Sequence, residues 1–166
     1  MNRVELKASF GIDDAGMISG TAWPFGTPDR VGDMIEKGAF AGASLPIPML
    51  FAHDPAEPIG IWESATETEA GLEVRGRLLV DTVERAREIR SLVQAGAVTG
   101  LSIGFMTRKA APRKGGGRNI SDLNLVEISL VTIPAHPGAR ITASKDATAA
   151  IRIAEAITRA AVALRT

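Results

Sequence analysis

Residues 123–133, LNLVEISLVTI, constrain the fold more than any other stretch of the chain. Apolar side chains occupy both alternating faces of this run, which is typical of a strand that is covered on both sides. The run therefore predicts a central, buried strand.

Glu127 lies in the middle of this apolar run. An ionised carboxylate buried there costs several kcal/mol unless it has a partner. One interpretation is structural, with an arginine as the partner; the candidates are Arg75, Arg77 and Arg108. A second interpretation is functional, in which Glu127 holds an imidazole that activates a hydroxyl, and Ser129 on the same face helps to hold Glu127.

Most other periodic segments indicate strands. Weak or clear alternation, bounded by turn residues, predicts strands at 4–10, 16–23, 48–53, 59–68, 72–80 and 101–107, with a last short one at Ile141. Residues 27–45 are rich in Gly, Asp and Pro and predict a long excursion with short ordered pieces. The basic run 112–118 contains three glycines and predicts a flexible, solvated loop.

Two segments have helical spacing instead. Residues 82–95 place Val83, Ala86, Ile89, Leu92 and Val93 on one face, and Gly96 follows as a stop signal. Residues 146–165 form a second, Ala-rich amphipathic pattern. We therefore expect a mostly β (α+β) fold, a barrel surrounded by helices over residues 1–145, followed by a C-terminal helix or tail over 146–166.

Composition excludes several classes of protein. Lysine plus arginine equals aspartate plus glutamate at 19 each, which argues against a protein built to bind nucleic acid. The chain has no cysteine and two histidines, so thiolate chemistry is excluded and a histidine-rich metal site is not expected. No run resembles a signal peptide or a membrane span, so we expect a cytosolic protein without a membrane partner.

Residues 100–105, GLSIGF, contain the pattern G-x-S-x-G. That pattern forms the nucleophile turn of α/β-hydrolases, but there a helix follows the serine, whereas here the predicted helix precedes it. On a strand instead, Leu101 and Ile103 face the core, while Ser102 and Gly104 face the opposite side. Gly104 would then let backbone or substrate approach the serine closely. Taken alone, the segment favours a structural interpretation, in which Ser102 is a polar residue on a half-buried strand beside a packing glycine.

His53 ends the predicted strand 48–53, on the same face as Met49 and Phe51. A histidine in that position is either a hydrogen-bonded core residue or a general base. Taken alone, the pattern favours the core residue.

Four short motifs in order carry a resemblance to a known family. They are Asp33 with Gly38-Ala39-Phe40, then LFAH at 50–53, GLSIGF at 100–105, and EISLVTIPA at 127–135. Together they resemble the prohead (capsid-maturation) proteases of tailed phages, over about residues 4–143. That family is related in fold to the herpesvirus assemblins, serine proteases built on a β-barrel ringed by helices.

The resemblance implies that Ser102 is the nucleophile, His53 the general base and Glu127 the third member. The chain departs from the usual pattern at 134–137, PAHP, where an asparagine is expected instead of His136. His136 is therefore an alternative third member. Asp54, Asp122 or no third residue are the remaining options.

Oxyanion donors are expected in the turn after the Glu127 strand. The candidates are the backbone N–H groups of Gly138, Ala139 and Arg140, since Pro134 and Pro137 have no N–H.

The function implied is a serine endopeptidase that cleaves the capsid precursor, its scaffold part and its own termini inside the assembling prohead, in the host cytoplasm. No metal or organic cofactor is expected. Self-association is expected, with helix 146–166 docked on another protomer or on its own barrel. Two rival hypotheses are a non-catalytic capsid-assembly or scaffold-binding barrel and, more weakly, a barrel that carries a small ligand.

Overall fold

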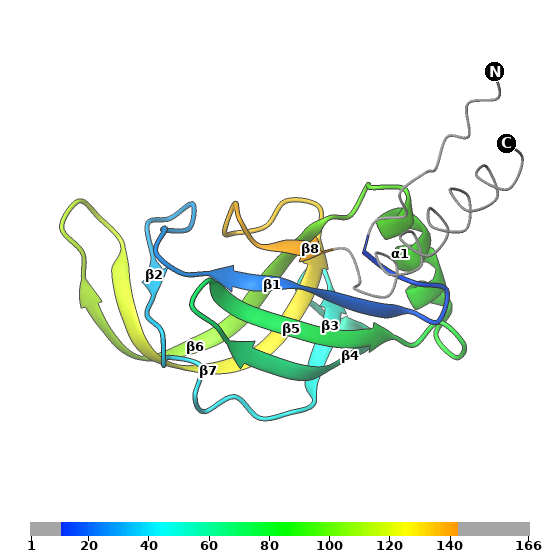
Figure 1. The fold of residues 1–166 in the computed structure, drawn as a ribbon, viewed down its shortest axis with the longest axis horizontal. Coiled ribbons are helices and arrows are strands. Elements are labelled where there is room, and N and C mark those ends of the chain that lie inside the picture. Colours follow the sequence, from blue (N-terminus) through cyan, green and yellow to red (C-terminus); the bar gives the residue numbers. More distant parts are fainter. Residues whose placement is uncertain (1–10, 143–166) are drawn as a thin grey trace, which may run out of the picture.

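The strands form one sheet that curls into a barrel (Figure 1). The computed structural model describes residues 11–142. The strand order is β2-β7-β3-β4-β5-β1-β8-β6, and the further pairing of β6 with β7 closes the ring. The strands are β1 (Met17–Pro24), β2 (Met34–Ile35), β3 (Ile47–Phe51), β4 (Asp54–Glu67), β5 (Gly71–Leu78), β6 (Gly100–Pro112), β7 (Arg118–Val131) and β8 (Arg140–Thr142). The mostly β fold predicted from the sequence is confirmed.

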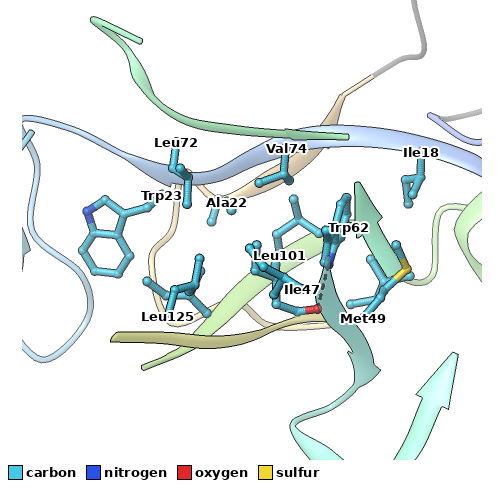
Figure 2. Packing of buried hydrophobic residues seen from close by; sticks show 14 of the residues in the cluster. Ile18, Ala22, Trp23, Ile47, Met49, Trp62, Leu72, Val74, Leu101 and Leu125 are labelled. Carbon is cyan, nitrogen blue, oxygen red and sulfur yellow. Dashed lines mark hydrogen bonds between the residues drawn. The ribbon is translucent and has the colours of Figure 1, made fainter. Parts of the chain in front are cut away.

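The barrel interior is filled by apolar side chains from every second strand position (Figure 2). Trp62 of β4 lies fully buried, and its indole N–H donates to the carbonyl of Ile128 on β7 at 3.0 Å. Leu101 of β6 points into the same core. Because alternate residues face opposite sides, Ser102 is turned toward the outer face of the barrel wall.

The single helix of the described residues is α1 (Glu84–Gln94), as predicted within two residues at its start. Ala86, Ile89 and Val93 are buried, while Leu92 is partly exposed at the edge of the predicted face. Gly96 follows the helix with φ of 78°, a backbone conformation that favours glycine. No helix within residues 11–142 is long and apolar enough to cross a membrane.

β6 and β7 form a hairpin longer than the sequence predicted. The strands pair out to Pro112 and Arg118, so the predicted loop 112–118 is reduced to a tip at 113–117. Arg118 is held by Asp33, whose carboxylate accepts from the Arg118 backbone N–H at 2.9 Å and from its guanidinium at 2.5 Å. The expectation of a flexible loop is therefore wrong for Arg118, because a buried carboxylate from the 27–45 excursion anchors it.

The predicted strand at 4–10 and the predicted helix at 146–166 lie outside the described residues. The proposed division at residue 145 also lies outside them.

Candidate active site

Ser102 lies in β6, directly opposite Ser129 of the neighbouring strand β7. Its neighbours Leu101 and Ile103 are buried in the core, and the serine itself is only 4% exposed. The strand placement expected from the sequence is therefore the one observed.

His53 lies in a tight turn and not in a strand, which corrects the sequence prediction. β3 ends at Phe51, β4 begins at Asp54, and these two residues pair directly. Ala52 and His53 form the two-residue connection, with φ of 53° and 61°. Positive φ at both central residues is the pattern of a type I′ hairpin turn. The imidazole is consequently half-exposed, with 45% of the side chain accessible, instead of facing the core beside Met49.

β7 holds this turn in place. The N–H of Ala52 donates to the carbonyl of Leu130 at 3.0 Å, and the N–H of His53 donates to the hydroxyl of Ser129 at 3.0 Å. A left-handed conformation costs roughly 1–2 kcal/mol for each residue other than glycine. The neighbouring strand thus stabilises a backbone shape that Ala and His do not favour.

Three predicted side chains meet beside the turn. The Ser102 hydroxyl lies 2.9 Å from Nε2 of His53. The second ring nitrogen, Nδ1, lies 2.6 Å from Oε1 of Glu127. Since a carboxylate only accepts, Nδ1 carries the proton and Nε2 is free to accept from the serine. This is the hydrogen-bond order of a nucleophile, a base and an orienting acid.

The pKa of His53 is raised above the ordinary histidine value. The main cause is the hydrogen bond from its ring to Glu127, with a further contribution from the negative charge of Glu127, and partial burial opposes both. The protonated ring, the imidazolium, is therefore stabilised relative to the neutral ring. A general base needs this stabilisation once it has taken a proton.

Glu127 is buried, 7% exposed, and its partner is the imidazole. Two of the arginines that the sequence offered as partners pair with different acids: Arg77 binds Glu63 at 2.9 Å, and Arg108 lies 3.9 Å from Asp122. The second carboxylate oxygen of Glu127, Oε2, accepts from the Ser129 hydroxyl at 2.7 Å.

Gly104 provides the space for Glu127. The two residues are paired across β6 and β7, and the Glu127 carboxylate lies over the Gly104 backbone. A Cβ at position 104 would overlap Oε1 of Glu127. The sequence predicted that backbone or substrate would approach closely at this glycine, and the group that lies there in the structure is the Glu127 carboxylate.

His136 lies apart from these three side chains. Its Nε2 is 3.1 Å from the Thr27 carbonyl, its Nδ1 accepts from the Gly138 N–H at 3.0 Å, and its ring packs edge-on against Trp23. The structure therefore does not bring His136 to His53.

The two aspartates that the sequence allowed as a third member also have partners of their own. The Asp54 carboxylate accepts from the Ala56 N–H at 2.8 Å, and Asp122 faces Arg108. Among these acids, the one bonded to the His53 ring is Glu127.

The predicted oxyanion donors lie in the loop that leads to β8. The N–H groups of Gly138 and Ala139 both donate to His136, one to its ring and one to its carbonyl. Arg140 pairs with Gly100, two residues before Ser102 on β6. The assignment of oxyanion donors stays a prediction.

Within residues 11–142, no group of three or more histidine, cysteine, aspartate or glutamate side chains is arranged to hold a metal ion.

Sequence comparison finds a family. Residues 3–152 match the model described as caudovirus prohead serine protease. The chain is 36% identical over 153 residues to the prohead protease of Enterobacteria phage HK97, covering 87% of this chain and 66% of that protein. It is also 36% identical over 149 residues to the capsid polyprotein of Pseudomonas phage PAJU2, covering 86% of this chain and 22% of that protein. The chain thus spans just under two thirds of the first relative and about a fifth of the second.

Structural comparison finds a similar fold. The capsid assembly protease of bacteriophage T4 matches with a TM-score of 0.56 and 15% identity, over 70% of this chain and 81% of that one. At this identity the likeness concerns the fold alone. The resemblance on which the sequence prediction rested, to prohead proteases of tailed phages, is confirmed by the family match.

Proposed function

The chain belongs to the caudovirus prohead serine protease family, and from this we propose that it is a serine endopeptidase of capsid maturation, with Ser102, His53 and Glu127 as its catalytic residues. The observation that carries the proposal is the unbroken hydrogen-bond chain from the Ser102 hydroxyl through the His53 ring to the Glu127 carboxylate.

Peptide hydrolysis would proceed through an acyl-enzyme. His53 Nε2 takes the proton of Ser102 as the hydroxyl oxygen attacks the scissile carbonyl, and the same nitrogen then protonates the leaving amine. Glu127 keeps the proton on Nδ1 and stabilises the imidazolium. Water then attacks the acyl carbon as His53 accepts its proton, and the bond from that carbon to the Ser102 oxygen breaks as His53 returns the proton to Ser102. The negative oxygen of the tetrahedral intermediate needs backbone donors near Ser102, for which Arg140 on β8 is the candidate.

The substrate that we propose is the capsid precursor with its scaffold part, together with the termini of the protease. The relatives support this choice, because one is named a prohead protease and the second a capsid polyprotein. Cleavage would take place inside the assembling prohead, in the host cytoplasm. Self-association is also part of the proposal; sedimentation over a range of concentrations tests it, and a monomer mass throughout would remove it.

The test is co-expression of the full chain with the capsid precursor of the same genome, with intact masses measured for both. Ser102→Ala is expected to reduce precursor cleavage at least about 1,000-fold. The matched control is Ser121→Ala, the same change on β7 outside the hydrogen-bond chain, which is expected to cleave normally. A peptidyl phosphonate should label wild-type chain on Ser102.

The rival is a non-catalytic assembly or scaffold-binding barrel. It predicts unchanged precursor processing in folded Ser102→Ala and no phosphonate adduct on wild-type chain. Either result, obtained with a chain that melts like wild type, would overturn the protease proposal.

A further inference from the structure

Ser129 is a fully buried hydroxyl next to the site that peptide hydrolysis itself does not use. It lies two residues after Glu127 on β7, with Ser102 of β6 opposite on one edge and Leu50 of β3 on the second edge. Ser129 therefore lies where two strands pair with β7: β6, which carries Ser102, and β3, which leads to His53.

The hydrogen bonds of Ser129 have fixed directions. A backbone N–H can only donate, so the 3.0 Å contact with His53 N uses the Ser129 oxygen as acceptor. The hydroxyl proton is then available for the 2.7 Å contact with Oε2 of Glu127. One side chain thus binds the backbone of the base and the carboxylate that orients the ring of that base.

We infer that Ser129 is a positioning residue, whose hydroxyl fixes the His53 backbone and the Glu127 carboxylate relative to each other and so keeps the imidazole in line with Ser102. Its effect on catalysis rests on the proposed function, whereas its effect on the His53 ring does not.

The need for such a residue follows from the two groups it joins. His53 has an unfavourable positive φ, so its turn keeps its shape only where neighbouring groups hold it. The Glu127 carboxylate can rotate about its last side-chain bond unless both of its oxygens are bound. The His53 ring binds only Oε1, so Oε2 needs a second partner. Without the Ser129 hydroxyl, the part-buried N–H of His53 and a buried carboxylate oxygen of Glu127 would both lose their partner.

Other charged groups beside the β3–β4 hairpin belong to β4 and α1. Asp54 follows His53 in the chain and accepts from Ala56, and Arg85 of α1 stacks over Phe51 at 5.0 Å while pairing with Glu57. These groups are engaged with one another or with the backbone. Glu127 therefore contacts His53 in two ways: directly at the ring, and through the Ser129 hydroxyl at the backbone N–H.

The test is a pH titration of the His53 ring by NMR in the full chain, with the signals assigned by His53→Gln, since His136 is the second histidine. Wild type should titrate above the ordinary value of about 6.5. In Ser129→Ala the midpoint should fall toward that ordinary value, because a mobile Glu127 no longer holds the Nδ1 proton. Ser121→Ala, the same change on the same strand, should titrate like wild type.

Two further measurements make the result decisive. Ser129→Cys keeps the size but replaces the hydroxyl by a weak hydrogen-bonding thiol, and it should shift the midpoint in the same direction if Ser129→Ala does not fold. The rate of phosphonate labelling on Ser102 should fall about 10- to 100-fold in either variant. A wild-type midpoint in the folded variant would overturn the role of Ser129. Absence of labelling in wild type would instead overturn the proposed function, and the titration would still decide the role of Ser129.

Discussion

Two of the hairpin turns within residues 11–142 use positive φ, and they are built from different residues. At the tip between β6 and β7, Gly115, Gly116 and Gly117 have φ of 98°, 106° and 75°. At the turn between β3 and β4, Ala52 and His53 have φ of 53° and 61°. The first turn uses the residue that carries no steric penalty, and the second does not.

The difference follows from what each turn must present. The tip presents no side chain that the proposed chemistry uses, so glycine is sufficient there. The β3–β4 turn must carry an imidazole beside Ser102, and glycine has none. The strain of two left-handed residues, roughly 1–2 kcal/mol each, is comparable to what the N–H bonds to Leu130 and Ser129 contribute, about 0.5–1.5 kcal/mol each. The turn therefore depends on β7, and a change in β7 acts on the base as well as on the acid.

Among the variants that test this comparison, Gly104→Ala has the largest expected effect, because this glycine is required for space and not for φ. A Cβ there would displace the Glu127 carboxylate, which is the movable end of a side chain, so the barrel should stay folded. Displacing the orienting group by about 1 Å should reduce the rate of precursor cleavage or phosphonate labelling about 100-fold. The control is Gly42→Ala, whose Cβ meets only the end of Arg108 at 3.4 Å. Wild-type rates in folded Gly104→Ala would show that Glu127 does not orient the base.

Much of this site could be predicted from single segments. Glu127 stands out because a carboxylate in an apolar strand needs a partner, and the alternation around Ser102 shows which face the serine occupies. The order of strands with one helix likewise predicts a mostly β barrel. These inferences need only local periodicity and the cost of burial.

The remaining features depend on pairing between distant segments. Ala52-His53 lacks the Asn-Gly type of signal that marks a type I′ turn, so the pattern predicts a strand that continues through His53. The role of Gly104 depends on its register opposite Glu127, and the length of the β6–β7 hairpin depends on an anchor from Asp33. None of these can be read from one segment alone.

Asp33→Asn tests whether the tip is a structural turn only. The pKa of Asp33 is lowered, chiefly by its side-chain hydrogen bond with Arg118, so the carboxylate stabilises the fold above its ordinary pKa of 3.8. That contribution should be lost as the pH falls through the lower folded pKa. Because the Arg118 side chain is half-exposed, we expect the free energy of unfolding to fall by only about 1 kcal/mol at pH 7, measured by urea. The difference from wild type should shrink near pH 3, and cleavage should be unchanged.

The matched control is Asp122→Asn, which removes a looser pair with Arg108 at 3.9 Å and should change stability by less than about 0.5 kcal/mol. Loss of cleavage in folded Asp33→Asn would mean that the tip is coupled to the site, and the separation of the two turns would not hold.

Ala52→Gly has the smallest expected effect, because two contributions oppose each other. The change removes one left-handed penalty but adds backbone entropy to the unfolded chain, so we expect a gain of about 0.5–1 kcal/mol in the free energy of unfolding. The reverse exchange at the tip, Gly116→Ala, is the control and should lose stability: no atom lies within 4 Å of its Cβ position, so the loss would come from φ alone. Urea unfolding of both variants measures whether each change raises or lowers the free energy of unfolding. If Ala52→Gly destabilised the chain, the backbone of this turn would not be strained. The hydrogen bonds from Ala52 and His53 to β7 would then not serve to hold an unfavourable backbone conformation.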